Sequence, residues 1–265
     1  MKQPFISFVI PAHNEERHIG LCLRALHRNK GKFEIILVND GSIDKTEEIA
    51  RKAGCDKILS FSKGHSAAFA RNRGAEKAAG EYIVFLDADQ LVEENFMDKC
   101  IKFLKEGKID GSDFLVYSYK PKTFIQHAWS AYRKAYPPMG FVHIVKRNVF
   151  MRLGFDEKIF YHEERDFRYR FDRKGFSYLK PSNETVYHID PENVDEFIRQ
   201  RKWQGKQAGL KFFLPCILPP TILIPFFKVL IGSKDPLNSF RWLFLDFFGR
   251  YISLYYRLRN IGKNF

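Results

Sequence analysis

Cysteine is scarce in this 265-residue chain, and its four residues, Cys22, Cys55, Cys100 and Cys216, are scattered. They form no Cys-x-x-Cys pair, and no pair of histidines has the spacing of a zinc site. This pattern is typical of a protein from a reducing compartment, and it predicts that the chain has no structural zinc.

An apolar stretch long enough to span a membrane is also missing. Residues 212–227 carry no charge, but they number sixteen and include four prolines. A spanning helix needs about 20 apolar residues and is broken by proline, so a re-entrant or interfacial segment fits better. Strand-like Phe5–Ile10 follows Met1–Gln3 at once, and we therefore expect no signal peptide.

Acidic residues are rare towards the C-terminus. Residues 197–265 contain twelve Lys or Arg against two Asp, which contributes +10 of the formal net charge of +13. Such a field suits nucleic acid, an anionic membrane surface or a diphosphate group. Because the basic residues are interleaved with long apolar runs, we expect a membrane surface and no nucleic acid.

A second apolar stretch, residues 240–258, carries one narrow polar stripe. Its members lie at the spacing of one helix face: Asp246, Arg250, Ser253 and Arg257. Aromatic residues flank this stripe, so the segment is typical of a helix that lies in the headgroup region of a membrane. The alternative is a helical pair that packs on the rest of the chain or on a second copy, which leaves a homo-oligomer open.

Strand-like and helix-like stretches alternate through the first half. In order, we expect a strand at Phe5–Ile10, a helix from about Glu15, a strand at Glu34–Val38, a helix from about Lys45, a strand at Lys57–Ser60, a helix at Ser66–Ala79 and a strand from Tyr82. Repeated βα units imply a largely parallel sheet flanked by helices. The sequence therefore predicts an α/β fold followed by a helical, basic tail.

Polar residues collect where the expected strands end. Pro11-Ala12-His13-Asn14-Glu15 follows the first strand, Asn39-Asp40-Gly41-Ser42 the second, and Asp87-Ala88-Asp89 the fourth. Ligands of α/β sheets bind beyond the carboxyl ends of the strands, so these segments predict a ligand crevice. Two carboxylates as close as Asp87 and Asp89 favour a bound Mg²⁺ with a phosphorylated ligand. Taken singly, each segment is also compatible with a solvated turn.

Four motifs in order resemble those of the family 2 glycosyltransferases, which are inverting enzymes of the GT-A fold that use nucleotide-diphosphate sugars. They are Val9-Ile10-Pro11-Ala12-His13-Asn14-Glu15, Val38-Asn39-Asp40-Gly41-Ser42-Ile43-Asp44, Ala70-Arg71-Asn72-Arg73-Gly74 and Gly80-Glu81-Tyr82-Ile83-Val84-Phe85-Leu86-Asp87-Ala88-Asp89. The resemblance covers roughly residues 5–205.

The resemblance implies a donor site. By their place in the motifs, its residues are Pro11, Ala12, Asn14, Glu15, Asp40, Arg71, Asp87, Ala88 and Asp89. In that family the residue matching Asp40 contacts the nucleoside and the one matching Asp87 lies near the ribose. The residue matching Asp89 holds Mn²⁺ or Mg²⁺ on the diphosphate. Asn39 departs from the family, where many members carry Asp, and we expect it to change base contacts modestly.

The second half supplies the expected catalytic base. Leu153-Gly154-Phe155-Asp156-Glu157 resembles the family's Gly-Gly-Phe-Asp-Glu turn, with one Gly missing. The family's Glu-Asp-x-Asp then maps onto Glu163-Glu164-Arg165-Asp166, which makes Glu164 the expected base for an acceptor hydroxyl and Glu163 the reserve candidate. The alternative is a charged helix N-terminus whose acids favour the helix dipole.

Other residues complete the expected site. In the family a His at the place of His188 often completes the metal and diphosphate site, although a lone His is usually a satisfied polar group. Arg199, Arg201 and Lys202 could neutralise the leaving diphosphate or an acceptor phosphate, or form a solvated helix face.

We therefore expect a membrane-associated, metal-dependent inverting glycosyltransferase on the cytoplasmic face of the cell membrane, with a lipid-linked or glycan acceptor. Residues 1–110 would bind the nucleotide sugar, residues 111–205 the acceptor, and residues 206–265 the membrane. The acidic cluster favours a sugar hydroxyl as acceptor, with a polyprenyl phosphate as the alternative. A non-catalytic nucleotide-sugar-binding scaffold also stays open.

Overall fold

The computed structural model of the chain describes residues 4–107, 109–135, 142–159, 163–180, 184–207 and 237. These residues fall into two compact units. The first contains residues up to Val116 and from Pro138 to Ile189, and the second contains Tyr117–Pro137 and the chain from Asp190 onward. Each unit is described separately below.

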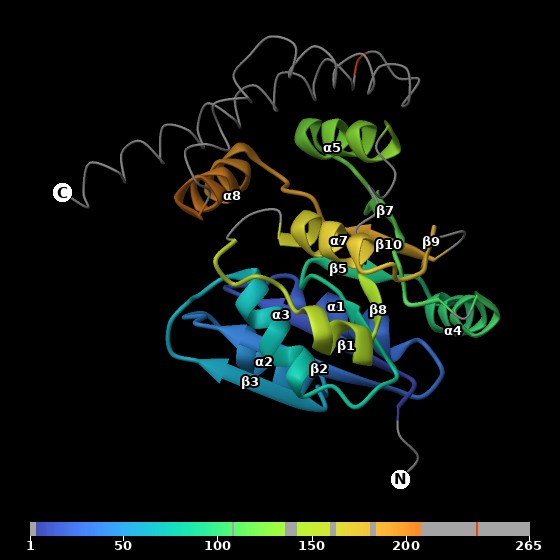
Figure 1. The fold of residues 1–265 in the computed structure, drawn as a ribbon. Coiled ribbons are helices and arrows are strands. Elements are labelled where there is room, and N and C mark those ends of the chain that lie inside the picture. Colours follow the sequence, from blue (N-terminus) through green and yellow to red (C-terminus); the bar gives the residue numbers. More distant parts are fainter. Residues whose placement is uncertain are drawn as a thin grey trace. The chain divides into compact units, whose positions relative to one another are not determined.

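The first unit begins with the predicted alternation of strands and helices (Figure 1). Its elements in the first half are β1 (Ile6–Ala12), α1 (Ile19–His27), β2 (Phe33–Asp40), α2 (Thr46–Lys52), β3 (Lys57–Phe61), α3 (Ala67–Glu76), β4 (Tyr82–Phe85), β5 (Gln90–Val92) and α4 (Phe96–Gly107). The prediction of a helix from about Glu15 was wrong by one turn, because residues 13–18 form a turn before α1.

Shorter elements follow. They are β6 (Gly111–Ser112), β7 (Leu115–Ser118, which crosses the division), β8 (Ile144–Lys146), α6 (Arg147–Leu153), α7 (Glu163–Arg173), β9 (Tyr178–Leu179) and β10 (Thr185–His188). Residues 142 and 143 lead into β8, and α6 follows β8 directly.

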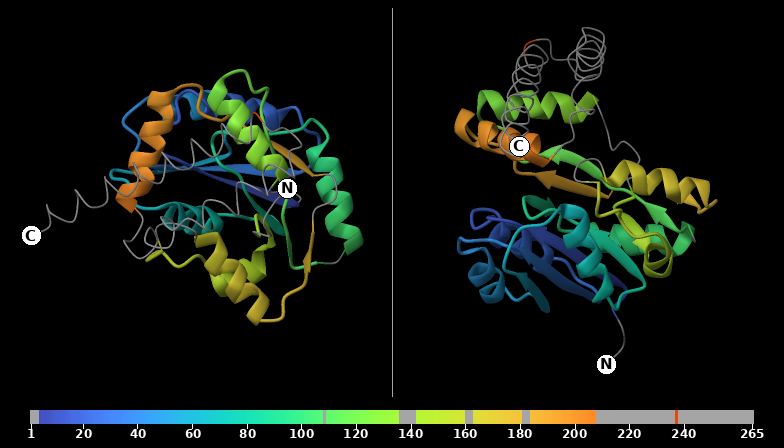
Figure 2. Two further views of the ribbon diagram at one scale, coloured as in Figure 1. Left: turned by 90° about the horizontal axis from the view of Figure 1, so that it is seen from above. Right: turned by 60° about the vertical axis from the view of Figure 1, so that its left-hand side comes forward.

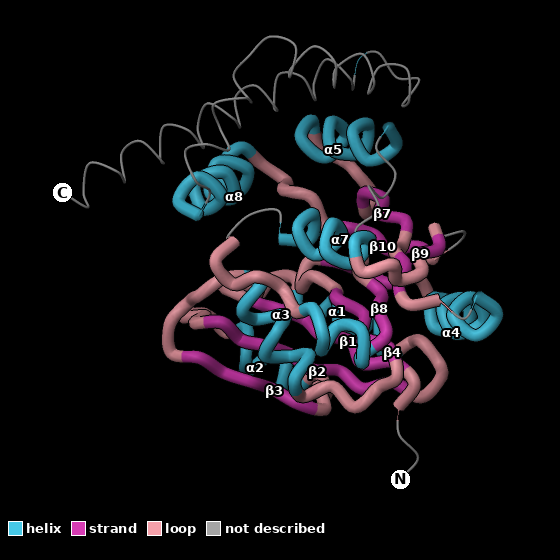
Figure 3. Tube along the Cα trace, in the orientation of Figure 1, coloured by secondary structure: helices cyan, strands magenta, loops and turns pink. Residues whose placement is uncertain are grey.

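The seven-stranded sheet has the order β3-β2-β1-β4-β8-β6-β9, and a three-stranded sheet has the order β5-β10-β7. Strands β3, β2, β1 and β4 lie side by side (Figure 3). They run parallel, with Ile6 opposite both Phe33 and Tyr82. β8 is antiparallel to both β4 and β6. The carboxyl ends of β1, β2, β3 and β4 therefore meet at one edge, as the sequence predicted.

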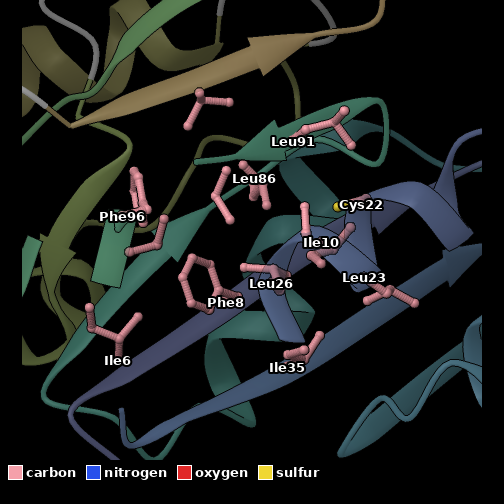
Figure 4. Packing of buried hydrophobic residues seen from close by; sticks show 14 of the residues in the cluster. Ile6, Phe8, Ile10, Cys22, Leu23, Leu26, Ile35, Leu86, Leu91 and Phe96 are labelled. Atoms are coloured by element: carbon pink, nitrogen blue, oxygen red, sulfur yellow. The ribbon is translucent and has the colours of Figure 1, made fainter. Parts of the chain in front are cut away.

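One face of the sheet packs against α1, α2 and α4. Alternate residues of β1, among them Phe8 and Ile10, point towards Cys22, Leu23 and Leu26 of α1 (Figure 4). The stripe at Ile19, Cys22, Leu23 and Leu26 is fully buried. Burying such an apolar stripe is what holds an amphipathic helix on a sheet.

The other face packs against α3, α6 and α7, so the parallel strands lie between two helical layers (Figure 2). α3 lies close to this face because Gly74 has no side chain. A Cβ at Gly74 would overlap Val9 Cγ1 and lie 3.0 Å from Val38 Cγ2. The last Gly of the Ala-Arg-Asn-Arg-Gly motif is therefore a packing residue.

The second unit contains α5 (Phe124–Ala135) and α8 (Val194–Gln207). Ile125, Ala128 and Ala131 of α5 form a small apolar cluster with Phe197 of α8. Arg133 Nη2 donates to the buried Asp190 Oδ1 at 2.7 Å, and Gln126 Nε2 donates to Asp190 O at 3.1 Å. These bonds tie the start of the α8 segment to α5.

No helix in the described part of the chain is long and apolar enough to cross a membrane. Residues 212–227 and 240–258, the segments expected to associate with the membrane, lie entirely outside the described residues. The expected functional boundaries at residues 110 and 205 remain predictions.

The close approach of α3 to the sheet predicts that Gly74→Ala destabilises the protein. The added methyl group must displace Val9 or Val38, and overpacking of this kind costs about 1–3 kcal/mol. This cost opposes the gain of about 1 kcal/mol that Ala normally brings to a helix. Urea unfolding should show the loss. Lys77→Ala, at the exposed end of the same helix, is the control, and equal or higher stability of Gly74→Ala would contradict the packing role.

Candidate active site

Three polar segments predicted from the sequence meet at the carboxyl edge of the sheet. Asn14 follows β1, and Ser42 and Ile43 follow β2. Asn14 N donates to Ser42 Oγ at 2.9 Å, and Ile43 N donates to Asn14 Oδ1 at 2.9 Å. Asn14 adopts a φ of 57°, and Gly41 a φ of 73°. The two loops are thus fastened to each other at the edge where a ligand of an α/β fold binds.

The start of this edge differs from the sequence expectation. β1 continues to Ala12, so Pro11 and Ala12 lie within the strand instead of after it. Ala12 is buried in the core, which leaves its backbone groups as its means of contacting a donor. Glu15 N donates to Thr46 Oγ1, and Glu15 Oε2 lies 2.8 Å from His18 Nδ1.

Asp40 is held by a histidine that the motif analysis missed. Asp40 Oδ2 accepts from His65 N at 2.8 Å, and Asp40 Oδ1 lies 2.8 Å from His65 Nδ1. The His65 ring stacks on Phe69 with the ring centroids 4.0 Å apart. His65 lies in the loop after β3, so the strand-end argument that found Asp40 would have found it if extended to the third strand.

Asn39, where many members of the resembled family carry Asp, has a local structural role. Its Nδ2 donates to Glu47 Oε2 at 3.0 Å, and its Oδ1 accepts from Ser42 N at 3.2 Å. Glu47 also accepts from Ser60 Oγ at 2.6 Å. Asn39 therefore fixes the loop after β2 against α2 and β3.

Arg71 is the centre of the candidate site. Its guanidinium is buried. Nη2 donates to Asp87 Oδ1 at 2.9 Å, while Nη1 donates to Glu163 Oε1 at 2.5 Å and to Glu164 Oε1 at 3.2 Å. The guanidinium also lies over the Phe155 ring at 5.7 Å. Three motifs that are far apart in the sequence thus converge on one cation.

The electrostatics follow from burial and this convergence. Burial would lower the pKa of Arg71, but the carboxylates of Asp87, Glu164 and Glu163 raise it above its usual value. Burial would raise the pKa of Asp87, but Arg71 and then His143 hold it below its usual range. Burial raises the pKa of Glu163 against the opposing effect of Arg71, and Glu164 adds to the rise. Burial thus favours the protonated form of Glu163 more than in a solvent-exposed glutamate.

The two candidate bases differ in access to solvent. The Glu163 side chain is 7% exposed and the Glu164 side chain 21%. Both lie in the first turn of α7. Glu164 is therefore the more accessible of the two carboxyls, and its assignment as the base stays a prediction.

Asp87 and Asp89 do not form one joint pair. β4 ends at Phe85, so both residues follow the strand. Asp87 faces Arg71 and is fixed by Gln90, which accepts from Asp87 N at 3.1 Å. Asp89 Oδ2 instead lies 3.3 Å from His188 Nε2, at the end of β10. Ala88 between them is buried in the core.

Asp89 and His188 have the character of an incomplete cation site. Asp89 Oδ1 is buried and has no hydrogen-bond partner among the described residues. Burial raises the pKa of Asp89 to about 6, His188 opposes this shift, and Glu15 and Asp87 add to it. No group of three or more potential metal ligands occurs in the described part of the chain. The oxygen and nitrogen donors present fit a cation that takes its other ligands from a bound phosphate.

Asn72 joins the site helix to the Gly-Phe-Asp-Glu turn. Its Oδ1 accepts from Phe155 N at 2.9 Å, and its Nδ2 donates to Phe155 O and Glu157 Oε1, both at 2.9 Å. This double backbone contact places the Phe155 ring beneath Arg71. The resemblance marked both motifs, but it did not indicate that they contact each other.

The predicted diphosphate cations lie in the second unit. Arg199 is an exposed residue of α8, and Arg201 and Lys202 continue the same helix. The side chains of Arg201 and Lys202 lie outside the described part of the structure. Their role stays a prediction.

Comparison with known sequences identifies related proteins. A profile described as "Glycosyl transferase family 2" matches residues 7–172, more than half of the chain. Amylovoran biosynthesis glycosyltransferase AmsB of Erwinia amylovora is 27% identical over 253 residues, which cover 83% of this chain and 79% of that protein. In contrast, the chain spans only 46, 38 and 35% of the length of three other curated relatives.

Solved structures share the fold. Mannosyltransferase PcManGT from Pyrobaculum calidifontis, in complex with GDP-Man and Mn²⁺, is 18% identical and superposes with a TM-score of 0.57, covering 96% of this chain and 75% of that one. S. aureus TarS 1-349 in complex with UDP-GlcNAc is 17% identical with a TM-score of 0.55, covering 94% and 73%. At these identities the likeness shows the fold alone.

The carboxylate cluster predicts that Arg71→Met strongly destabilises the protein. It leaves three carboxylates around a neutral side chain, and removing one partner of a buried ion pair costs about 3–5 kcal/mol. The loss should be larger at pH 8 than at pH 5, where the carboxylates can protonate. Urea unfolding of Arg71→Met and of the half-exposed Arg73→Met tests this, and equal losses for both variants would contradict it.

The raised pKa of Asp89 predicts that Asp89→Asn stabilises the metal-free protein. When the pKa of an acid is raised in the folded state, the protein becomes less stable as the pH rises from about 4 to about 6. The Asp89→Asn protein should therefore be more stable than the wild type by about 1–3 kcal/mol at pH 8 and equally stable near pH 4. Unfolding in the presence of a chelator measures this. Asp44→Asn should show the opposite sign, because hydrogen bonds from Thr46 and Glu16 outweigh burial and lower the pKa of Asp44.

Proposed function

The chain belongs to glycosyltransferase family 2, and from this premise we propose that it transfers a sugar from a nucleotide-diphosphate sugar to an acceptor hydroxyl. One observation carries the proposal. Asp87, Glu163 and Glu164 converge on the buried Arg71 at the carboxyl edge of the sheet. This arrangement puts a solvent-accessible carboxylate next to the edge where an α/β fold binds its ligand.

The donor would lie along the ends of β1, β2 and β4. Asp40 accepts hydrogen bonds from the nucleoside in this proposal, and Asp87 contacts the ribose. The solved relatives hold UDP-GlcNAc in one case and GDP-Man in the other, which supports a nucleotide sugar but favours no particular base. His65, stacked on Phe69, borders the Asp40 carboxylate and limits the space for a base.

A divalent cation would bind to Asp89 and His188 and to the donor diphosphate. The observation that supports this assignment is the buried Asp89 Oδ1, to which none of the described residues donates a hydrogen bond. The PcManGT structure contains Mn²⁺. Mn²⁺ or Mg²⁺ would supply positive charge to the diphosphate as it leaves. No other step in the proposed reaction depends on the metal.

The chain's own carboxylates would do the proton chemistry. Glu164 accepts the proton of the acceptor hydroxyl while the new bond from that oxygen to the anomeric carbon forms. The bond from the anomeric carbon to the diphosphate oxygen breaks, and the diphosphate leaves with the electron pair. Because the oxygen attacks from the face opposite the leaving group, the configuration inverts. Arg71 holds Glu164 in place, while Glu163 pairs with Arg71 from its buried position.

The acceptor and the location of the enzyme are further parts of the proposal. The acidic base favours a sugar hydroxyl on a lipid-linked or glycan acceptor, because a polyprenyl phosphate needs little help from a base. The basic, apolar residues 206–265 favour attachment to the cytoplasmic face of a membrane, with Arg199, Arg201 and Lys202 available to an acceptor or leaving phosphate.

We expect calorimetric titration with UDP-, GDP- and dTDP-sugars to show binding of one nucleotide class that requires Mn²⁺ or Mg²⁺. Asp89→Ala should lose the metal dependence. Glu164→Gln should keep donor binding but lose about 10²- to 10⁴-fold in transfer rate, because the base is absent. Glu163→Gln is the matched control and should lose less.

Three results would contradict parts of the proposal. Failure of every nucleotide sugar to bind would remove the donor site. Unchanged transfer by Glu164→Gln would remove the base, and it would favour an acceptor phosphate. Donor binding without any transfer would favour the non-catalytic scaffold.

A further inference from the structure

A histidine outside the family motifs lies next to the carboxylate cluster. The sheet order β4-β8-β6 aligns three residues along one edge, with Asp87 after β4, His143 before β8 and Asp113 after β6. Phe85 N donates to His143 O at 2.8 Å, which ties His143 to the end of β4. The donor strands β1 and β2 lie on the other side of β4. This row therefore extends the site away from the donor.

Asp113 and His143 form a closely packed dyad. His143 Nδ1 lies 2.6 Å from Asp113 Oδ1, and Phe114 N donates to the same oxygen at 2.8 Å. The Asp113 side chain is fully buried, and the His143 ring stacks on Phe114 with the centroids 4.9 Å apart. A buried carboxylate needs a compensating donor or cation, so Asp113 favours the protonated form of His143.

The charges around His143 act in the same direction. The groups that face it are Asp113 from the end of β6, Asp87 from the end of β4 and Glu164 from α7. Burial would lower the pKa of His143, but these three carboxylates raise it above its usual value. Tyr178 of β9 borders Asp113, and burial raises the pKa of Tyr178 to about 12, so Tyr178 stays neutral.

The dyad also adds positive charge to a cluster in which the carboxylates outnumber the cations. Asp87, Glu163 and Glu164 share a single guanidinium, that of Arg71. A second positive charge next to Glu164 and Asp87 offsets part of the remaining negative charge. The Coulomb effect of His143 on Asp87 is second only to that of Arg71 among the groups that lower the pKa of Asp87.

We propose that Asp113 and His143 are positioning residues of the transfer reaction. Asp113 holds His143 as an imidazolium at the edge of the carboxylate cluster, where its positive charge acts on Glu164, the group that accepts the proton of the acceptor hydroxyl. The inference rests on the proposed function and deepens it. It assigns a role to two residues that lie outside the four family motifs.

The pH dependence of the transfer rate tests the proposal. His143→Gln removes the charge, so the acidic limb of the rate profile should move up by about one pH unit. On that limb the transfer rate of the variant should be about tenfold lower than that of the wild type. At high pH the two rates should be equal, with little change in the KM for the donor. His143→Lys keeps a positive charge and should hold the limb near its original position. His27→Gln, on the exposed side of α1, should not alter the profile.

A loss of rate by the same factor at every pH in His143→Gln would overturn the proposal, because it would indicate a structural role. Asp113→Asn provides a second variant if His143→Gln does not fold. It should shift the acidic limb in the same direction, and an unshifted limb would count against the dyad.

A measurement that needs no activity separates this inference from the proposed function. NMR titration of the His143 ring, identified by its absence in His143→Gln, should show a midpoint above the ordinary histidine value of about 6.5 that falls in Asp113→Asn. An unchanged midpoint in Asp113→Asn would refute the dyad even in an active enzyme. If no nucleotide sugar binds but the titration midpoint of His143 is raised and falls in Asp113→Asn, the proposed function is refuted while the dyad stands.

Discussion

The structure of the site depends on one buried guanidinium. Arg71 contacts carboxylates from the end of β4 and from the first turn of α7, and it reaches them because α3 lies close to the sheet at Gly74. Desolvating such a cluster is costly, and apolar residues of similar volume would often be at least as stabilising. A buried ionic cluster at a sheet edge is therefore better explained by chemistry than by stability. α3, β4 and α7 are positioned so that the Arg71 side chain of α3 contacts carboxylates from the other two elements.

The two Asp residues of the acidic pair have separate surroundings. Arg71 and Gln90 donate to Asp87, whereas the side chain of Asp89 lies next to one imidazole, and its buried Oδ1 has no hydrogen-bond partner within the described part of the chain. A carboxylate that is already neutralised by the protein is suited to orienting a neutral group such as a ribose. One that is under-neutralised attracts a cation. The buried Ala88 between them keeps the two environments apart although the residues are neighbours in the chain.

Much of this could be predicted from the sequence, because the relevant signals are local. Strand ends and parallel pairing were sufficient to bring Asp40, Asp87 and Asn14 to one edge. Apart from His65, which follows the end of β3, the partners of those residues could not be predicted in the same way. Gln90 and His143 reach the site through a turn and an antiparallel pairing that carry no periodic signal, and the contact of Asn72 with Phe155 joins segments 83 residues apart. The roles of the individual site residues stay predictions.

Three consecutive residues of α3 contact three different parts of the chain. Arg71 enters the carboxylate cluster, Asn72 clamps the turn at Phe155, and Arg73 pairs with Glu157. Successive residues of an α-helix are about 100° apart around its axis, so these roles require a fixed rotational phase. The phase is set at the start of the helix, where Ser66 Oγ accepts from Phe69 N, and it is held by Gly74 against the sheet. A single inserted residue between Ser66 and Arg71 would leave the helix intact but turn all three side chains away from their partners. The length of this short segment is therefore constrained as tightly as its composition.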